Sequence, residues 1–109
     1  MKKWLFTTFN FAILNLKKLQ KALEIFERAA QRGSAKGLYE LGQMYSNGYA
    51  GLTRDFGKKM ECCLKAAAQK PYVSKDGRIL PNAGVAQAEN SIAVSYKDGM
   101  GVDQVVSTL

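Results

Sequence analysis

A short phrase occurs twice in the chain and constrains its fold more than any other feature. The sequence LGQMYSNG at residues 41–48 returns as IAVSYKDG at residues 92–99, 51 positions later. In each copy a tyrosine stands four residues after an aliphatic residue, and a glycine stands three residues after the tyrosine. Apolar residues at this spacing are typical of one face of a helix, and a following glycine is typical of a helix end. The phrase therefore predicts two equivalent helices.

A second helical pattern precedes each copy. Residues 19–33, LQKALEIFERAAQRG, carry one apolar stripe that stops at Gly33, and Ser34 is placed to cap the next helix. Residues 56–70, FGKKMECCLKAAAQK, repeat the apolar positions of that stripe with a shift of 37. These repeated patterns therefore predict an all-α fold of antiparallel helix hairpins. One unit covers residues 19–55 and the second covers residues 56–109.

Two positions of the repeated phrase, the glycine inside it and the tyrosine, make the packing prediction more specific. Gly42 would stand inside a helix, where glycine costs about 1 kcal/mol relative to alanine. We therefore expect another helix to pack closely against it. Tyr45 and Tyr96, the equivalent tyrosines, are expected to pack at the joint between each helix and the helix that follows.

The second unit contains an insertion. The shift between the units grows from 37 to 51 residues across the segment PYVSKDGRILPNAG, residues 71–84. The pair Asp76-Gly77 favours a tight turn, and apolar residues flank it on both sides. We predict a protruding loop or short β-hairpin bounded by the two prolines. Loops on rigid scaffolds often carry recognition, so four residues are contact candidates, with a neutral spacer as the alternative: Tyr72, Lys75, Asp76 and Arg78.

Residues 1–18 allow two interpretations. The start, MKKWLFTTFNFAIL, is basic and then uncharged, as in an export signal, but no small-residue cleavage site follows. The apolar spacing of Phe9, Ala12 and Leu16 continues into the first predicted helix, which favours an N-terminal helical segment. The uncharged run is shorter than the roughly 20 apolar residues that a membrane span needs. We expect no membrane span, and both interpretations stay open.

The residue types present exclude several kinds of chemistry. The 109 residues include no histidine, which removes the commonest general base, the commonest metal ligand and every Ser-His or Cys-His pair. Cys62 and Cys63 are neighbours in a predicted helix, so their side chains diverge by about 100°. They also fall short of the roughly four ligands of a zinc site. We expect two semi-buried thiols and no catalytic residue, cofactor or metal.

Two features of the sequence point to different cellular compartments. Free thiols suit a reducing cytosol and therefore favour a cytoplasmic protein. If residues 1–14 act as an export signal, the protein is instead periplasmic or secreted.

The net charge of +7 gives a mild preference for acidic partners. The basic residues are spread along the chain instead of forming a block, so we expect no nucleic-acid partner. One basic stripe does follow the first long helix, at spacings of 4, 7 and 4: Lys17, Lys21, Arg28 and Arg32. A solvated helix face explains it, and contact with an acidic partner is the second explanation. Binding of nucleic acid or an anionic surface through this stripe is the alternative function.

These features together resemble the Sel1-like repeats, relatives of the tetratricopeptide repeats with a unit of about 36 residues. The second unit matches less well, because Ala93 replaces a glycine, Cys63 replaces an aromatic residue and the insertion interrupts the unit. The matching residues of the first unit are Ala29, Ala30, Gly33, Ala35, Leu41, Gly42, Tyr45, Gly48 and Asp55. Those of the second are Ala66, Ala67, Gly84, Ala86, Ala88, Ile92, Ala93, Tyr96, Gly99, Gly101 and Val102.

The resemblance implies a short α-solenoid, an α-α superhelix, that binds another protein. Members of this family are common in bacteria, many are exported, and some act as partners or inhibitors of secreted effectors. The implied function is a non-enzymatic scaffold, adaptor, regulator or immunity-type inhibitor. The resemblance carries over no catalytic residue.

A solenoid usually needs about three stacked units, and two units leave the last helix uncovered on one side. We therefore expect that the chain is a piece of a longer array or that its C-terminal end pairs with another copy or a partner. An uncovered apolar face of this kind marks an interaction site. For self-association, the expected contact residues are Val102, Val105, Val106 and Leu109.

Overall fold

The fold is mostly helical, as predicted. The computed structural model describes the backbone of residues 2–102 and the side chains of residue 10 and residues 12–102. The elements in chain order are α1 (Lys2–Gln31), α2 (Ala35–Asn47), the 3-10 turn η1 (Tyr49–Gly51), α3 (Phe56–Ala67), β1 (Tyr72–Val73), β2 (Ile79–Leu80) and α4 (Val85–Asp98).

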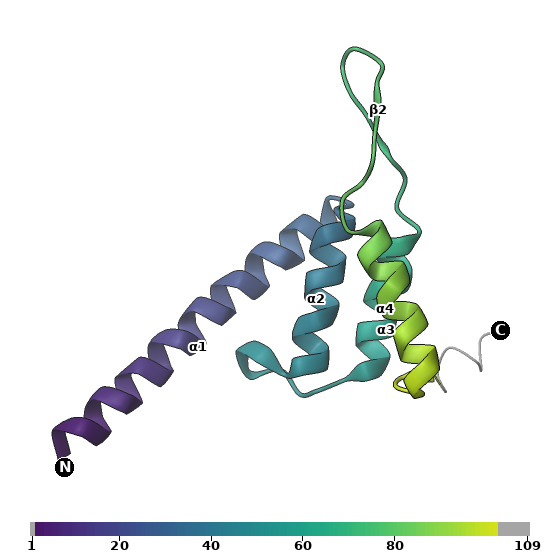
Figure 1. The fold of residues 1–109 in the computed structure, drawn as a ribbon. Helices are drawn as coiled ribbons and strands as arrows, with labels where there is room; N and C mark the ends of the chain where they lie inside the picture. Colours follow the sequence, from purple (N-terminus) through teal and green to yellow (C-terminus); the bar gives the residue numbers. More distant parts are fainter. Residues whose placement is uncertain (1, 103–109) are drawn as a thin grey trace.

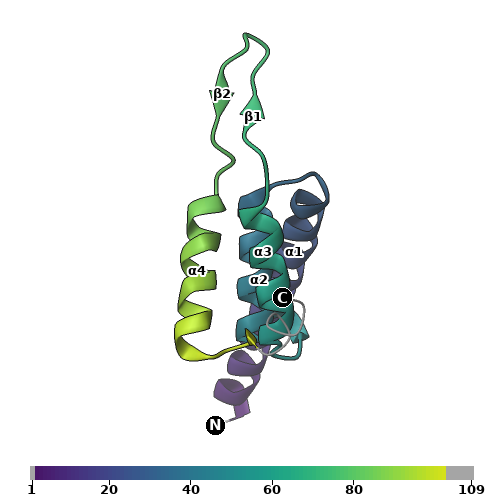
Figure 2. The ribbon, with the colours of Figure 1, turned by 90° about the vertical axis from the view of Figure 1, so that its right-hand side faces the viewer.

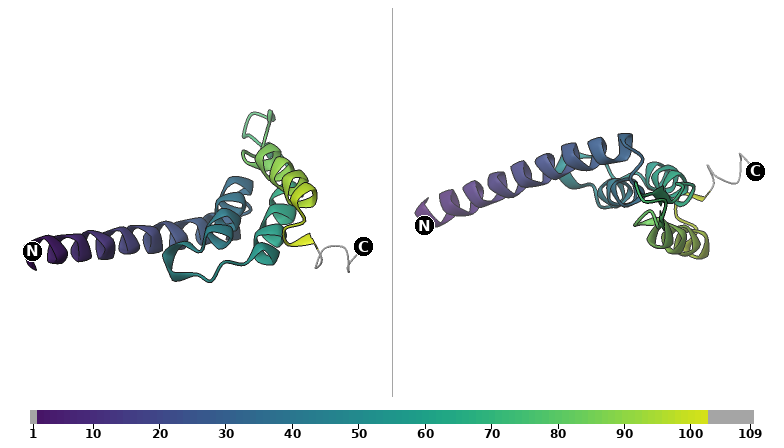
Figure 3. Two further views of the ribbon diagram at one scale, coloured as in Figure 1. Left: turned by 60° about the horizontal axis from the view of Figure 1, so that its bottom comes forward. Right: turned by 90° about the horizontal axis from the view of Figure 1, so that it is seen from above.

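Consecutive helices run in opposite directions and pack on one another. α1 packs on α2, α2 on α3, and α3 on α4 (Figure 1). Seen from the side, α2, α3 and α4 stand next to each other, and the β1–β2 hairpin projects beyond their ends (Figure 2). α1 is longer than the other helices, and its N-terminal half extends away from them (Figure 3).

Local signals in the sequence account for the helix boundaries. The Ser34 hydroxyl accepts a hydrogen bond from the Gly37 N–H at the start of α2, over 3.0 Å, as expected for an N-cap. The Asp55 carboxylate accepts one from the Lys58 N–H at the start of α3, also over 3.0 Å. Because these side chains satisfy N–H groups that the helix leaves without partners, they stabilise the ends at which the helices begin.

The core is built largely from small side chains between α2, α3 and α4. Its buried members are Ala35, Leu38, Cys63, Ala66 and Ala88. A β-carbon on Gly42 would lie 3.2 Å from both the Cys62 Cβ and the Lys59 carbonyl oxygen, which confirms the predicted close packing at this glycine. Cys63 is buried, Cys62 is half-buried, and both are free thiols, as predicted.

The two tyrosines of the repeated phrase differ in their surroundings. Tyr45 is half-buried, and the Lys58 ammonium lies 5.1 Å from the centre of its ring. Tyr96 is 42% exposed, so the prediction that it packs at a helix joint is wrong. Within residues 2–102, α4 packs on α3 and α2, and no further helix lies on its other side. Val102 is half-buried, whereas Val105, Val106 and Leu109 lie outside the described residues.

Among residues 2–102, no helix combines the length and the apolar character needed to cross a lipid bilayer.

Candidate interaction site

The insertion forms an antiparallel β-hairpin, which confirms the hairpin prediction for this segment. Tyr72 pairs with Leu80 and Val73 pairs with Ile79, between the two prolines. The hairpin stands clear of the helices (Figure 2). Val73 is 72% exposed and Ile79 is 74% exposed, and Tyr72 and Leu80 are also exposed. Four large apolar side chains therefore face solvent on one small element.

Ser74 organises the tip of the hairpin. Its N–H donates to the Arg78 carbonyl oxygen over 2.8 Å, and its carbonyl oxygen accepts from the Gly77 N–H over 2.9 Å. Its hydroxyl accepts from the Arg78 N–H over 3.0 Å and donates to the Asp76 carboxylate. These bonds close the turn from within, so its shape does not depend on contact with the helices.

The charged residues of the tip pair with each other. Arg78 Nε lies 2.8 Å from Asp76 Oδ2. The Ser74 hydroxyl, followed by the Arg78 backbone and side chain, lowers the pKa of Asp76 below its ordinary value. The carboxylate is therefore ionised at neutral pH, and the ion pair adds to the order of the turn.

Asn82 fixes the base of the hairpin. Its side chain is buried, with 6% of the residue exposed. The Asn82 Oδ1 accepts from the Ala35 N–H over 3.0 Å, and its Nδ2 donates to the carbonyl oxygens of Gly33 at 3.1 Å and Lys70 at 3.2 Å. One amide thus ties both ends of the insertion to the turn between α1 and α2. The sequence prediction missed this residue.

The structure divides the eight predicted contact residues into two groups. Tyr72, Lys75, Asp76 and Arg78 lie together on the hairpin and are all exposed. Lys17, Lys21, Arg28 and Arg32 lie along α1 and are also exposed. Acidic residues interrupt this basic stripe, because Glu24 lies 3.5 Å from the Lys21 ammonium and Glu27 lies in the same part of the surface. The hairpin group is therefore the more compact candidate site.

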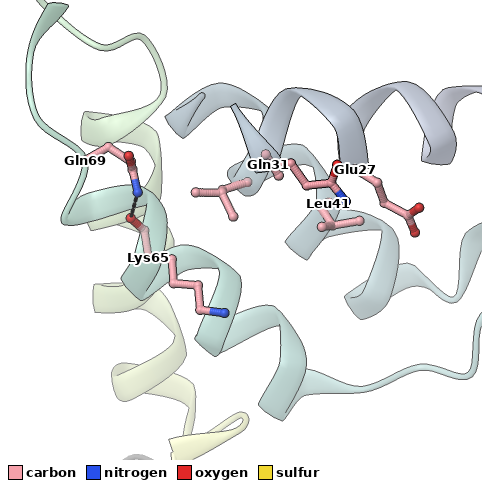
Figure 4. A pocket seen from close by; sticks show the side chains of 7 residues that line it. Glu27, Gln31, Leu41, Lys65 and Gln69 are labelled. Carbon is pink, nitrogen blue, oxygen red and sulfur yellow. Dashed lines mark hydrogen bonds between the residues drawn. The ribbon is translucent and has the colours of Figure 1, made fainter. Parts of the chain in front are cut away.

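A groove between α1, α2 and α3 is a second surface that the sequence prediction missed. It is shallow, its apolar lining residues are Ala30, Leu38 and Leu41, and its volume is about 360 Å³. Its polar lining residues are Glu27 and Gln31 on α1, Lys65 on α3, and Gln69 just after α3 (Figure 4). The groove can accept a few apolar side chains of a partner.

Both cysteine thiols have raised pKa values because they are removed from solvent. Burial, followed by the neighbouring Cys63, raises the pKa of Cys62 from 9.0 to about 11. Burial also raises the pKa of Cys63. The reactive form of a cysteine is the thiolate, so both residues are poor nucleophiles near neutral pH. In the part of the chain that the structure describes, no three His, Cys, Asp or Glu residues are grouped to hold a metal ion.

The rate of alkylation of Cys62 tests whether its pKa is raised in the folded chain. At pH 8 we expect iodoacetamide to modify native Cys62 about 100-fold more slowly than an ordinary thiol, because the higher pKa lowers the thiolate fraction by that factor. Mass spectrometry of digested samples follows the reaction, and the chain in denaturant is the control. Since the pKa is higher in the folded state, the stability linked to this thiol is fully present below about pH 9 and declines as the pH rises toward 11. A native rate close to the denatured rate would contradict the prediction.

Comparison with known proteins does not assign the chain to a family. No protein family, curated protein or solved structure gave a significant match to the chain.

Proposed function

We propose that the chain is a non-enzymatic protein–protein interaction module, in which a short solenoid of Sel1-like helix hairpins carries a recognition hairpin. The observation that carries the proposal is the β1–β2 hairpin, which exposes large apolar side chains while hydrogen bonds hold its tip and its base. A contiguous group of exposed apolar residues marks an interaction surface. A loop that is already ordered loses little conformational entropy on binding. The hairpin combines both properties.

The pairing of the strands indicates what kind of surface the partner offers. Residues opposite each other on an antiparallel pair share a face, and consecutive residues point to opposite faces. Val73 and Ile79 therefore form one apolar face, and Tyr72 and Leu80 form the other. The Val73–Ile79 face is the more exposed, so we place it at the centre of the contact. A partner that covers both faces needs a cleft that admits the hairpin.

The groove between α1, α2 and α3 supports the same role. It combines apolar and polar lining residues, as protein contact surfaces do. The helices hold the groove and the hairpin on one framework, so a single partner or two partners can be bound. This arrangement fits a scaffold, adaptor, regulator or immunity-type inhibitor.

The test begins with identification of the partner. Tagged full-length chain recovers its partner from the native host, and purified components then give the dissociation constant. We expect the double substitution Val73→Asp and Ile79→Asp to weaken binding by 100-fold or more, since each apolar side chain contributes about 1.5–3 kcal/mol when buried. The double substitution Ile25→Asp and Leu64→Asp, at exposed apolar residues of α1 and α3, is the matched control and should leave the affinity nearly unchanged.

A deletion separates recognition from folding. Removal of residues 73–80 should leave the helical circular dichroism signal nearly intact, because the paired strands bring the two remaining ends close together. Binding of the identified partner should be lost in the same variant. If the deletion and the double substitution both leave the dissociation constant unchanged, the hairpin is not the recognition element.

A further inference from the structure

The packing of α2 on α3 forms the joint between the two helix hairpins. At the middle of this joint, a β-carbon added to Gly42 would lie 3.2 Å from the Cys62 Cβ, so the two helices approach closely. At one end, the Lys58 ammonium of α3 lies 5.1 Å from the centre of the Tyr45 ring of α2, within the range of a cation–π contact.

At the other end of the joint, Leu38 of α2 lines the groove together with Lys65 and Gln69, which come from the end of α3 and just after it. The contacts therefore run in opposite directions along the two helices, as antiparallel packing requires. Three α2 residues define one side of the joint, and four residues of α3 and its C-terminal end define the other.

The α2 side of this joint has an equivalent on α4. A shift of 51 residues gives three positions, which we call the α4 face: Glu89, Ala93 and Tyr96. All three are exposed, and they lie along one side of the helix because they are spaced by four and three residues. The side of α4 that packs on α3 carries the buried residues Ser91 and Ser95 instead.

The α3 side of the joint has an equivalent on α1. A shift of 37 residues gives four positions, which we call the α1 face: Lys21, Ile25, Arg28 and Arg32. All four are exposed, and Ile25 is 49% exposed. The last three line a shallow hollow of about 350 Å³ together with Ala29. Because α1 and α4 lie at opposite ends of the row of helices (Figure 1), each chain presents both sides of its own joint to solvent.

The two faces carry opposite charges at matching positions. Where α2 has the apolar Leu38, the α4 face has Glu89. The α1 residues equivalent to those beside Leu38 are Arg28 and Arg32. Among the side chains that the structure describes, none of these three charged groups has an ion-pair partner. One face therefore offers a carboxylate where the other offers two guanidinium groups, which bind carboxylates well.

We propose that copies of this chain stack head to tail, with the α4 face of one copy packed on the α1 face of the next. The arrangement repeats the packing of α2 on α3. Ala93 lies against Ile25 of the next copy, and the Tyr96 ring lies beside Lys21 of that copy. Glu89 reaches the hollow that contains the two arginines. The faces are different, so each added copy leaves one face of each kind free, and the array stays open.

Other occupants match these faces less well. Symmetric pairing of two α1 faces would bring basic residues together, with no carboxylate in either face to oppose them. Symmetric pairing of two α4 faces would leave Arg28 and Arg32 without an acidic group. A nucleic acid would neutralise the arginines but would leave the α4 face uncovered. The stack uses neither the hairpin nor the groove, so the inference goes beyond the proposed contact with another protein.

Charge reversal tests the contact in the full chain, with sedimentation velocity at increasing protein concentration. The original chain should form species larger than a dimer. Glu89→Arg, or Arg28→Glu with Arg32→Glu, gives the two faces like charges, so each variant alone should associate about tenfold more weakly or worse. An equal mixture of the two variants restores opposite charges at every contact and should recover the association. This recovery also shows that both variants are folded.

Matched controls carry the same charge changes elsewhere. Glu61→Arg on α3, and Lys70→Glu with Lys75→Glu near and in the hairpin, replace exposed residues outside the two faces. These variants should associate like the original chain, because only the net charge changes.

Cysteine cross-linking tests the register of the stack. The internal equivalents of Ala93 and Ile25 are Gly42 and Cys62, whose β-carbon positions are close to the separation that a disulfide spans. A chain with both Ile25→Cys and Ala93→Cys should form a ladder of dimers, trimers and larger species on oxidation. A mixture of the two single variants should stop at dimers. The original chain, which retains its own two cysteines, is the control and should form no ladder.

Four results would overturn the inference. The first is a chain that stays monomeric up to millimolar concentration. The second is unchanged association of the variant with Arg28→Glu and Arg32→Glu alone, which would place α1 outside the contact. The third is a mixture of the charge-reversed variants that stays dissociated. The fourth is a double-cysteine chain that forms no species larger than a dimer, which would indicate a closed, symmetric contact.

Discussion

Replacement of Asn82 by alanine is expected to lower the free energy of unfolding by about 3 kcal/mol. The Asn82 amide makes hydrogen bonds to Ala35, Gly33 and Lys70 from a buried position. Alanine removes all of these bonds and leaves polar backbone groups without a partner, which costs more than the loss of an exposed hydrogen bond. Urea denaturation should show a lower midpoint with an unchanged slope.

The matched control for this change is Asn90→Ala. Asn90 is exposed on α4, and alanine is the better helix former, so the stability should stay within about 0.5 kcal/mol of the original chain. If Asn82→Ala also stays within this range, the amide does not hold the hairpin to the turn between α1 and α2.

Gly84→Ala is expected to cost about 3–5 kcal/mol, because two effects add. Gly84 has a φ of +104°, a conformation that residues with a side chain rarely adopt. A β-carbon at this position would also lie 2.5 Å from the backbone nitrogen and Cα of Lys36. Because the obstruction is backbone at the start of α2, α4 would have to move away from α2. Thermal and urea unfolding measure the loss.

A second glycine separates these two effects. Gly77, in the hairpin turn, has a φ of +84°, but nothing lies within 4 Å of an added β-carbon. Gly77→Ala should therefore cost only the conformational part, about 1–2 kcal/mol. Equal losses for the two variants would show that α2 and α4 are not in close contact at Gly84.

The features that could be predicted from the sequence are those with a local physical cause. Ser34 caps α2 through the N–H of a residue three positions away, and Asp76-Gly77 forms a turn within its own segment. The apolar stripes of the helices likewise depend on neighbours three or four positions apart. For the same reason, the hairpin was predicted correctly as a structural element, whereas the contact role of its four candidate residues stays a prediction.

The features that the sequence did not reveal depend on residues far apart in the chain. Asn82 bonds to Ala35 across 47 positions, and an asparagine in the segment Pro-Asn-Ala-Gly, residues 81–84, looks only like a turn residue. The groove combines α1, α2 and the end of α3, so no single segment indicates it. Tyr96 was misjudged because its pattern equals that of Tyr45, whereas its exposure depends on whether another helix covers α4.

The side chain of one residue, Asn82, supplies the hydrogen bonds that hold the base of the hairpin to the turn between α1 and α2. Sequence changes in the hairpin and sequence changes at its base therefore have different consequences. Substitutions, insertions or deletions between Tyr72 and Leu80 change the exposed surface of the hairpin, but they leave Asn82 and its three backbone partners in place. Under the proposed function, this segment can therefore diversify while the helical framework stays under separate selection. For protein engineering, the same property makes residues 73–79 a natural position for grafted peptides or randomised libraries.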